Sequence, residues 1–336
     1  MHTNIIGSQK EKKENSKNNM GNRRIFGIGE TVLDVIFRND QPTAAVPGGS
    51  AFNAIISLGR SVGIKYPEIP ILMITETGDD HIGDIIVKFM RDNNVSTDAV
   101  TRNKDTKSHI SMAFLDDNND AQYEFYKDHA HASLDSDKFA GVEFTKDDIV
   151  LFGSFFAINP VLRKYTYRLI SSAYKAGALI YYDINFRKPH IKDLPDTIGN
   201  IIENFSFSTV VRGSTEDFSL LFGTSDPQEI YDKHLKDHCK LFICTDGGKP
   251  ISVHTPNFSA KYSVKTIETI STIGAGDNFN AGFLYGIIRN GLSKDLLVEA
   301  DKSQWDSLIA FGQLFSSEVC QSIYNYIGLH TLDSYL

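Results

Sequence analysis

Two glycine-rich stretches of the sequence stand directly before helix starts and could bind an anion. The first, STIGAGDNFNAGF, spans residues 271–283, and apolar residues recur at helical spacing from Phe279 onward. A helix should therefore begin just behind Gly274, Ala275 and Gly276. Unpaired N–H groups and the helix dipole would attract a phosphate there. Glycine suits this place because a Cβ would block the approach of the phosphate.

A carboxylate, Asp277, lies where these glycines meet the helix. It could be the N-cap of the helix, which is a common role for aspartate at such a junction. It could instead be a base that takes the proton from a hydroxyl attacking the phosphate held beside it. Taken alone, the stretch favours the cap, because glycine-rich turns before helices are common.

The second stretch, PGGSAFNA, places Gly48 and Gly49 before another helix, with Asn53 in the first turn. Glycines allow a polar ligand to approach the backbone closely, and an Asn side chain offers sugar hydroxyls both a donor and an acceptor. By itself this is also an ordinary turn with an exposed Asn. The two stretches together, in this order, are far more specific than either one alone.

Short apolar runs alternate with segments of helical periodicity along most of the chain. RIFGIG, IPILMIT, DIVLFG, ALIYYDIN, FSTVV and KLFICT are typical of buried strands. The helical segments cover residues 51–63, 79–94, 160–176, 193–204 and 214–222. This alternation predicts an α/β domain with three α/β/α layers and a mostly parallel central sheet.

Two regions, residues 31–46 and 97–126, contain extended, half-polar segments with no helix between them. In the second, HISMAFLD and AQYEFYKD flank an Asp/Asn turn and predict a hairpin. We expect these strands to form a small antiparallel sheet that acts as a lid. Residues 1–22 are rich in Lys, Asn, Glu and Ser, which predicts a disordered leader before one domain over residues 23–336.

Composition narrows the classes of partner. The formal net charge of −8 argues against nucleic acid, because binding DNA or RNA needs a basic face. No apolar run approaches the roughly 20 residues of a membrane helix, and the N-terminus lacks the apolar segment of a signal peptide. The 3 cysteines have no C-x-x-C spacing and suit a reducing compartment. We therefore expect a cytoplasmic protein with neither a nucleic-acid nor a membrane partner.

The order of the motifs resembles that of the ribokinase-like (phosphofructokinase-B) carbohydrate kinase family. GETVLD, PGGSAFNA, TETGDDHIGD, DINFR, STEDF, TDGG and TIGAGDNFNAGF follow one another as in that family, from about residue 24 to about residue 320. The resemblance implies that Asp277 is the catalytic base, which takes the proton from a primary hydroxyl of the sugar. It also implies that Gly274, Ala275 and Gly276 form an anion hole for the transferred phosphoryl group.

The resemblance assigns further contacts to each substrate. Sugar contacts would be Asp34, Gly48, Gly49 and Asn53. ATP contacts would be Asn185, Arg187, Ser214, Thr245 and Gly247, where the Arg187 fork suits phosphate oxygens. A magnesium ion would be held by Asp217 or Glu216, through water.

Three positions depart from the family pattern. Ser271 stands where relatives have an Asp that helps to hold a monovalent cation, so dependence on such a cation is open. The family's Asn-x-x-Glu, which organises magnesium, reads Ser214 to Asp217 here. Pro250 replaces a common glycine in the nucleotide loop. None of these changes touches Asp277 or the glycines before it.

The resemblance implies an ATP- and magnesium-dependent sugar kinase that phosphorylates a primary hydroxyl, and its motifs look fructokinase-type. Residues 30–53 contain only Arg38 as a basic residue, which favours an uncharged sugar such as fructose over a sugar phosphate. The alternatives are a kinase for 2-keto-3-deoxygluconate or an adenosine-like nucleoside, and a catalytically silent sugar-binding regulatory protein. By resemblance we also expect a homodimer through the lid sheet.

Overall fold

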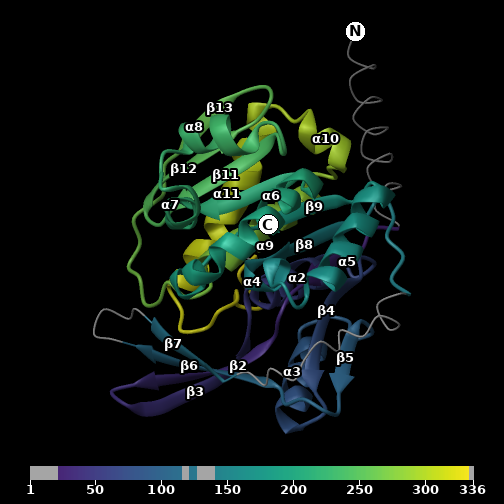
Figure 1. The fold of residues 1–336 in the computed structure, drawn as a ribbon, viewed down its shortest axis with the longest axis vertical. Coiled ribbons are helices and arrows are strands. Elements are labelled where there is room, and N and C mark those ends of the chain that lie inside the picture. The colour runs from purple at the N-terminus through teal and green to yellow at the C-terminus, as the bar shows by residue number, and fades with distance from the viewer. Residues whose placement is uncertain (1–21, 116–120, 127–140, 333–336) are drawn as a thin grey trace.

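The computed structural model describes residues 22–115, 121–126 and 141–332. The predicted leader lies outside these residues, apart from Asn22, and so does the Asp/Asn turn predicted between the lid strands. Figure 1 shows a large sheet surrounded by helices, with a smaller sheet projecting from one end.

The large sheet has nine strands, most of them parallel. They are β1 (Ile25–Ile28), β4 (Ile71–Gly78), β5 (Val100–Asn103), β8 (Ile149–Gly153), β9 (Leu179–Asp183), β10 (Val210–Ser214), β11 (Leu241–Asp246), β12 (Lys249–His254) and β13 (Ser259–Tyr262). Their order is β13-β12-β11-β10-β9-β8-β1-β4-β5. All neighbours from β5 to β11 run parallel, whereas β12 and β13 pair antiparallel at one edge.

Consecutive residues of the central strands point to opposite faces of this sheet, and both faces are buried. Ile25 and Tyr181 belong to the apolar core on one face. Their neighbours Phe26 and Tyr182 belong to the core on the other face. Such strands read as continuous apolar runs, which is why the sequence predicts them well.

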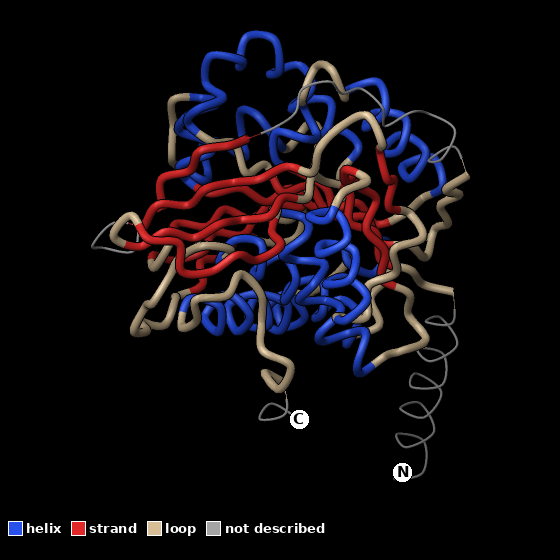
Figure 2. Tube along the Cα trace, turned by 90° about the horizontal axis from the view of Figure 1, so that it is seen from below, coloured by secondary structure: helices blue, strands red, loops and turns tan. Residues whose placement is uncertain are grey.

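Helices cover both faces and form the outer layers. Residues of one group pack into the first core: α2 (Ser50–Lys65), α3 (His81–Asp92), α9 (Ala275–Arg289), α10 (Lys294–Val298) and α11 (Lys302–Cys320). Residues of the other group pack into the second: α4 (Ser154–Ile158), α5 (Arg163–Ala176), α6 (Leu194–Phe207), α7 (Thr215–Phe222), α8 (Pro227–Ile230) and η2 (Tyr231–Leu235). A short segment, η1 (Lys188–Asp193), precedes α6. Figure 2 shows the strands as a red layer between the helices, which confirms the predicted α/β/α arrangement.

The smaller sheet contains β2 (Val32–Arg38), β3 (Gln41–Gly48), β6 (His109–Leu115) and β7 (Ala121–Tyr126), in the order β3-β2-β6-β7. A separate lid sheet is confirmed, and its two outer pairings are antiparallel as predicted. Its central pairing, β2 with β6, is parallel, because the chain leaves the lid after β3 and re-enters it from the main sheet. Within the predicted region 97–126, β5 pairs with β4 at the edge of the main sheet instead.

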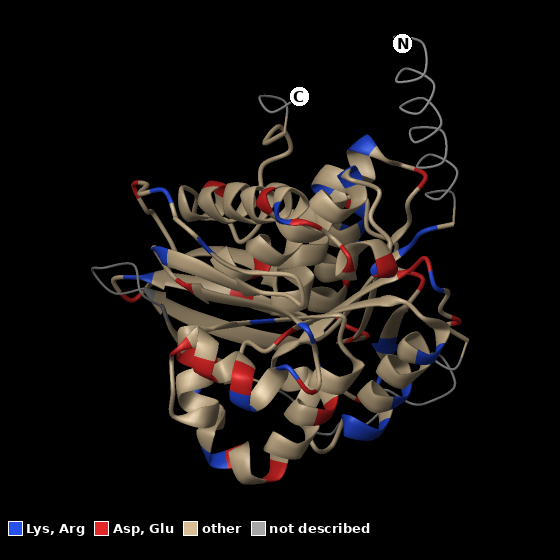
Figure 3. Cartoon of the chain, turned by 90° about the horizontal axis from the view of Figure 1, so that it is seen from above, with Lys and Arg blue, Asp and Glu red and all other residues tan. Residues whose placement is uncertain are grey.

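Charged residues lie mainly around this framework. Figure 3 shows basic and acidic segments interspersed on the outer helices and loops, while the strands of the main sheet carry few of either. Within the described part of the chain, no helix combines the length and the apolar character that a membrane span requires.

Candidate active site

A cavity of about 510 Å³ lies where the carboxyl ends of the main strands meet the lid sheet. Gly29, Gly78 and Gly153, which follow or end β1, β4 and β8, form part of its wall, as do Val32 and His109 of the lid. Open α/β sheets bind their ligands at this edge. The predicted site residues in the wall are Asp34, Gly49, Asn53, Asn185, Arg187, Gly274 and Asp277.

Asp277 is held at the cavity by the start of another helix. It is the third residue of α9 and is only 8% exposed. Its two carboxylate oxygens accept hydrogen bonds from Ser50 Oγ and Asn53 Nδ2, each at 2.9 Å. The sequence alone favoured a helix cap, but the N-cap of α9 is Gly274. The Asp277 side chain therefore does not cap α9. It points toward α2 and the cavity.

The glycines before α2 are required by close contacts, one with a backbone atom and one with a side chain. Gly49 has φ +128°, and a Cβ there would lie 2.3 Å from the carbonyl oxygen of Glu30. A Cβ on Gly48 would lie 2.1 Å from Oδ2 of Asp34. Gly48 does not line the cavity as a sugar contact would; it makes room for the Asp34 carboxylate, which does.

Two buried carboxylates share this site. Burial, with a smaller contribution from Asp183, raises the pKa of Asp277 to about 6, while Asn53 and Arg187 act in the opposite direction. Burial likewise raises the pKa of Asp34 to about 6, against the effects of Ser111 and Arg187. A carboxylate with such a pKa is mostly ionised at neutral pH yet basic enough to accept a proton.

The predicted anion hole lies at the start of α9. Gly274 has φ +76° and has no side chain that could cap the helix. The N–H of Ala275 donates to the carbonyl oxygen of Thr272 at 3.2 Å, so it is already engaged. Gly274 lines the cavity, whereas Ala275 and Gly276 are not part of its wall. The remaining N–H groups of the first turn have no acceptor within the helix and suit a phosphate.

Asn185 and Arg187 reach the cavity from the loop after β9. Asn185 adopts φ +39°, an uncommon conformation for a residue other than glycine that is often found at functional sites. Between them, the N–H of Phe186 donates to Asp217 Oδ1 at 2.7 Å. Asp217 thus anchors the loop that presents both side chains.

The other predicted nucleotide residues lie outside the cavity wall, on neighbouring strands. Ser214 and Thr245 face each other in the β10–β11 register, and Gly247 lies in the turn after β11. Ser214 is the N-cap of α7 and forms a capping box with Asp217. The Asp217 carboxylate accepts from Ser214 N–H and Oγ at 2.6 and 2.7 Å.

These contacts bear on the predicted magnesium ligands. Asp217 is buried and engaged by protein donors, so it does not suit a metal ligand, whereas Glu216 is exposed. Across the described residues, no three His, Cys, Asp or Glu side chains gather as a metal site. A magnesium ion arriving with ATP needs only one or two carboxylates, since phosphates and water complete its shell. Of the two predicted contacts, the exposed Glu216 is therefore the one left to reach such an ion.

A monovalent cation fits less well. The Ser271 hydroxyl accepts from Ile273 N–H at 3.2 Å, and the Cys320 carbonyl accepts from two backbone N–H groups. Asn278 Nδ2 donates to the carbonyl oxygens of Gly274 and Asn325, each at 2.8 Å. A neutral hydroxyl thus replaces the family's acid, and the neighbouring carbonyls already have donors.

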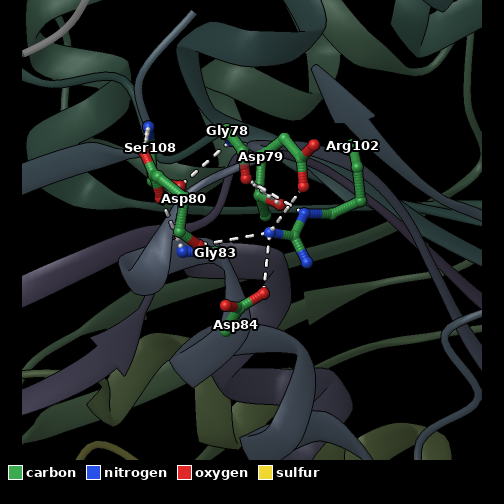
Figure 4. A network of polar contacts seen from close by, with 8 residues as sticks. Gly78, Asp79, Asp80, Gly83, Asp84, Arg102 and Ser108 are labelled. Carbon is green, nitrogen blue, oxygen red and sulfur yellow. Dashed lines mark hydrogen bonds and ion pairs between the residues drawn. The ribbon is translucent and has the colours of Figure 1, made fainter. Parts of the chain in front are cut away.

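The root of the lid is fixed to the main sheet by a polar network (Figure 4). Asp80, the N-cap of α3, accepts from Gly83 N–H and from the N–H and Oγ of Ser108, at 2.7–2.9 Å. Arg102 on β5 contacts Asp84 and the carbonyl oxygens of Gly78 and Asp80. Ser108 lines the cavity and directly precedes β6, so the TETGDDHIGD motif helps to fix the point at which the chain re-enters the lid sheet.

Sequence reasoning missed several residues of the site. Ser50 lies inside PGGSAFNA, a stretch that the sequence already indicated, but its contact with Asp277 was not predicted. Lys107 and Asn325 also line the cavity. Lys107 lies just before β6, and Asn325 lies in the segment after α11. Neither segment contains a recognised motif.

The sequence matches the family described as pfkB family carbohydrate kinase over residues 23–332. A fructokinase of Rhizobium leguminosarum bv. trifolii is 28% identical over 294 residues, covering 83% of this chain and 84% of that protein. Probable fructokinase-5 of Arabidopsis thaliana is 23% identical over 276 residues, covering 80% and 83%.

Solved structures share the fold. Fructokinase with bound ATP from Xylella fastidiosa has a TM-score of 0.77 at 19% identity, covering 93% of this chain and 97% of that one. Aminoimidazole riboside kinase from Salmonella enterica, complexed with aminoimidazole riboside and an ATP analog, also has a TM-score of 0.77, at 18% identity, covering 93% and 99%. The ribokinase-like fold is therefore confirmed. With the family match extending over nearly all of the described residues, the chain belongs to the pfkB family of carbohydrate kinases.

Proposed function

We propose that this carbohydrate kinase transfers the γ-phosphoryl group of ATP to a primary hydroxyl of a monosaccharide, with Asp277 as the base. One observation carries the proposal: Asp277 lies in the cavity, held by Ser50 and Asn53, beside a helix start that has no side-chain cap. This arrangement sets a proton acceptor next to an anion site, which is the pairing that phosphoryl transfer needs.

In this mechanism the sugar binds between the lid and the main sheet, with Asp34 accepting hydrogen bonds from its hydroxyls. Asp277 takes the proton of the attacking hydroxyl, while the first turn of α9 and Arg187 stabilise charge on the phosphoryl group. ATP lies along the ends of β10 and β11, near Thr245 and Gly247. Glu216 would hold a magnesium ion that arrives with ATP, through water, and such an ion would neutralise phosphate charge.

Fructose is the substrate we propose. The relatives named above include fructokinases, and a fructokinase from Vibrio cholerae O395, solved in a fructose-, ADP- and calcium-bound form, has a TM-score of 0.77. The cavity also contains Lys107, which could bind a carboxylate. This residue makes 2-keto-3-deoxygluconate, an acidic sugar, the second candidate.

We further propose a homodimer formed through the lid. Tyr126 of β7 is 54% exposed, and an exposed aromatic residue on an outer strand favours association. Sedimentation at working concentration tests this, and a monomer would remove the claim. We place the protein in the cytoplasm, because the reaction consumes ATP and Cys239, Cys244 and Cys320 are all free.

A coupled assay of ADP release tests the function directly. Fructose, ribose, 2-keto-3-deoxygluconate and adenosine are each supplied with ATP and magnesium, in potassium and in tetramethylammonium buffers. We expect the highest kcat/KM with fructose and no more than about twofold stimulation by potassium. Absence of turnover with every acceptor would favour the silent regulatory protein over the kinase.

A further inference from the structure

Arg212 is a buried cation that the site described above does not yet use. It lies on β10, and its side chain is 9% exposed. Its Nη1 donates to Asp183 Oδ1 at 2.9 Å, and its Nη2 donates to Thr245 Oγ1 at 2.6 Å. Arginine keeps its charge in such a place because its pKa is far above neutrality.

The same guanidinium group packs against the start of α9. A Cβ built on Gly276 would lie 2.9, 3.0 and 3.3 Å from Nη1, Nη2 and Cζ of Arg212, which are its three nearest atoms outside the immediate chain. Glycine at this position therefore makes room for the guanidinium group of Arg212 beside the helix start. The guanidinium group of Arg212 is thus a positive charge in direct contact with the start of α9.

The Asp183–Arg212 ion pair is held in place, on the side of Asp183, by a chain of buried hydrogen bonds. Asp183 Oδ2 accepts from Asn280 Nδ2 at 2.8 Å, and Asn280 Oδ1 accepts from the hydroxyl of Tyr181 at 2.9 Å. Asn280 and Tyr181 are at most 1% exposed. These contacts keep the Asp183 carboxylate, and with it Arg212, in one position.

We propose that Arg212 is a positioning residue for phosphoryl transfer: it keeps a fixed positive charge behind the anion hole at Gly276 and orients the Thr245 hydroxyl. A fixed charge in a dry region acts strongly on charge that develops nearby in the transition state. The charge of Arg212 adds to the partial positive charge that the helix dipole places at the N-terminus of α9. Because Thr245 Oγ accepts from Arg212, its own proton is available to donate to a nucleotide oxygen.

The alternative is that Arg212 only neutralises Asp183. A buried ion pair is costly to break from one side, because the remaining charge is left unpaired. Replacing Arg212 alone cannot separate the two roles. The double variant Asp183→Asn/Arg212→Gln removes both charges and keeps polar side chains of similar size, so the region stays neutral overall.

The inference rests on the proposed kinase activity, so all variants are compared with wild-type turnover of fructose and ATP in the presence of magnesium. For the double variant we expect a melting temperature near that of wild type and an unchanged KM for fructose. We expect kcat to fall about 10- to 100-fold, as for residues that position groups in direct contact with the reaction. Arg212→Lys, which keeps the charge, should retain kcat within about fivefold.

A double variant with wild-type kcat would overturn the proposal and assign Arg212 to charge balance alone. Arg212→Lys with a more than tenfold loss of kcat would overturn it as well, whether or not the double variant folds. The proposed function has a separate criterion: if wild type turns over no acceptor, the kinase proposal fails before Arg212 is considered.

Discussion

Helices α9 and α7 begin in a similar way in the sequence, with an aspartate at the third position. In α9 this residue is Asp277, and in α7 it is Asp217. The residue before α7 is Ser214, whose side chain and the Asp217 carboxylate cap the helix reciprocally. The residue before α9 is Gly274, which has no side chain with which to form such a box.

The difference shows that the N-cap residue decides whether a side chain satisfies the first N–H groups of a helix. The capping box at α7 satisfies N–H groups that could otherwise bind an anion. At α9 the glycine has no side chain that could satisfy such groups, and the Asp277 carboxylate accepts hydrogen bonds from Ser50 and Asn53. We therefore expect chemistry at α9, and at α7 mainly support for the loop that carries Asn185 and Arg187.

The largest expected effect comes from removing the proton acceptor at α9. Asp277→Asn should lower kcat on the order of 100- to 10,000-fold, the range for a general base. Burial raises the pKa of Asp277 to about 6, so its charged form opposes folding above that pH, and the amide should not lower the melting temperature. Asp217→Asn is the matched variant at α7, and a loss of kcat equal to that of Asp277→Asn would break the comparison.

Asp34 should act on sugar binding more than on the chemical step. Because its carboxylate would accept hydrogen bonds from sugar hydroxyls, Asp34→Asn should raise KM for fructose about 10- to 100-fold, as expected when a charged hydrogen bond is lost. Steady-state kinetics against fructose measure the change. Asp40→Asn, at the exposed turn of the β2–β3 hairpin, is the control. An unchanged KM for Asp34→Asn would remove Asp34 from the sugar contacts.

The two helix starts also show what the sequence could predict. The N-terminal glycines and Asp277 lie in one contiguous motif, so their placement could be predicted without the fold. Ser214 to Asp217 is likewise a local capping pattern, whereas the resemblance assigns these residues to ATP and magnesium. Arg212 had no comparable signal, because only the β10–β11 pairing and the packing of α9 bring it to Thr245 and Gly276.

The pH dependence of kcat tests whether Asn53 tunes Asp277. The base must be deprotonated to act, so kcat should fall as the pH drops through about 6. The Asn53 hydrogen bond favours the charged carboxylate. Asn53→Ala should therefore move this midpoint upward by about one pH unit, with kcat at saturating fructose restored at high pH. A midpoint that stays in place would contradict this role of Asn53.

The smallest effect on catalysis is expected at the cap of α7. Ser214→Ala removes the cap but leaves Asp217 bound to Phe186 N–H. The free energy of unfolding should fall by about 1 kcal/mol, the usual value of an N-cap side chain, which urea denaturation can measure. Ser219→Ala, an exposed serine of the same helix, should show no such loss. We expect kcat and KM for ATP within about twofold of wild type, since a hydroxyl committed to the helix start is not available to the nucleotide. A tenfold rise in KM for ATP would instead indicate that Ser214 contacts ATP. The starts of α7 and α9 would then both bind a substrate, contrary to the comparison.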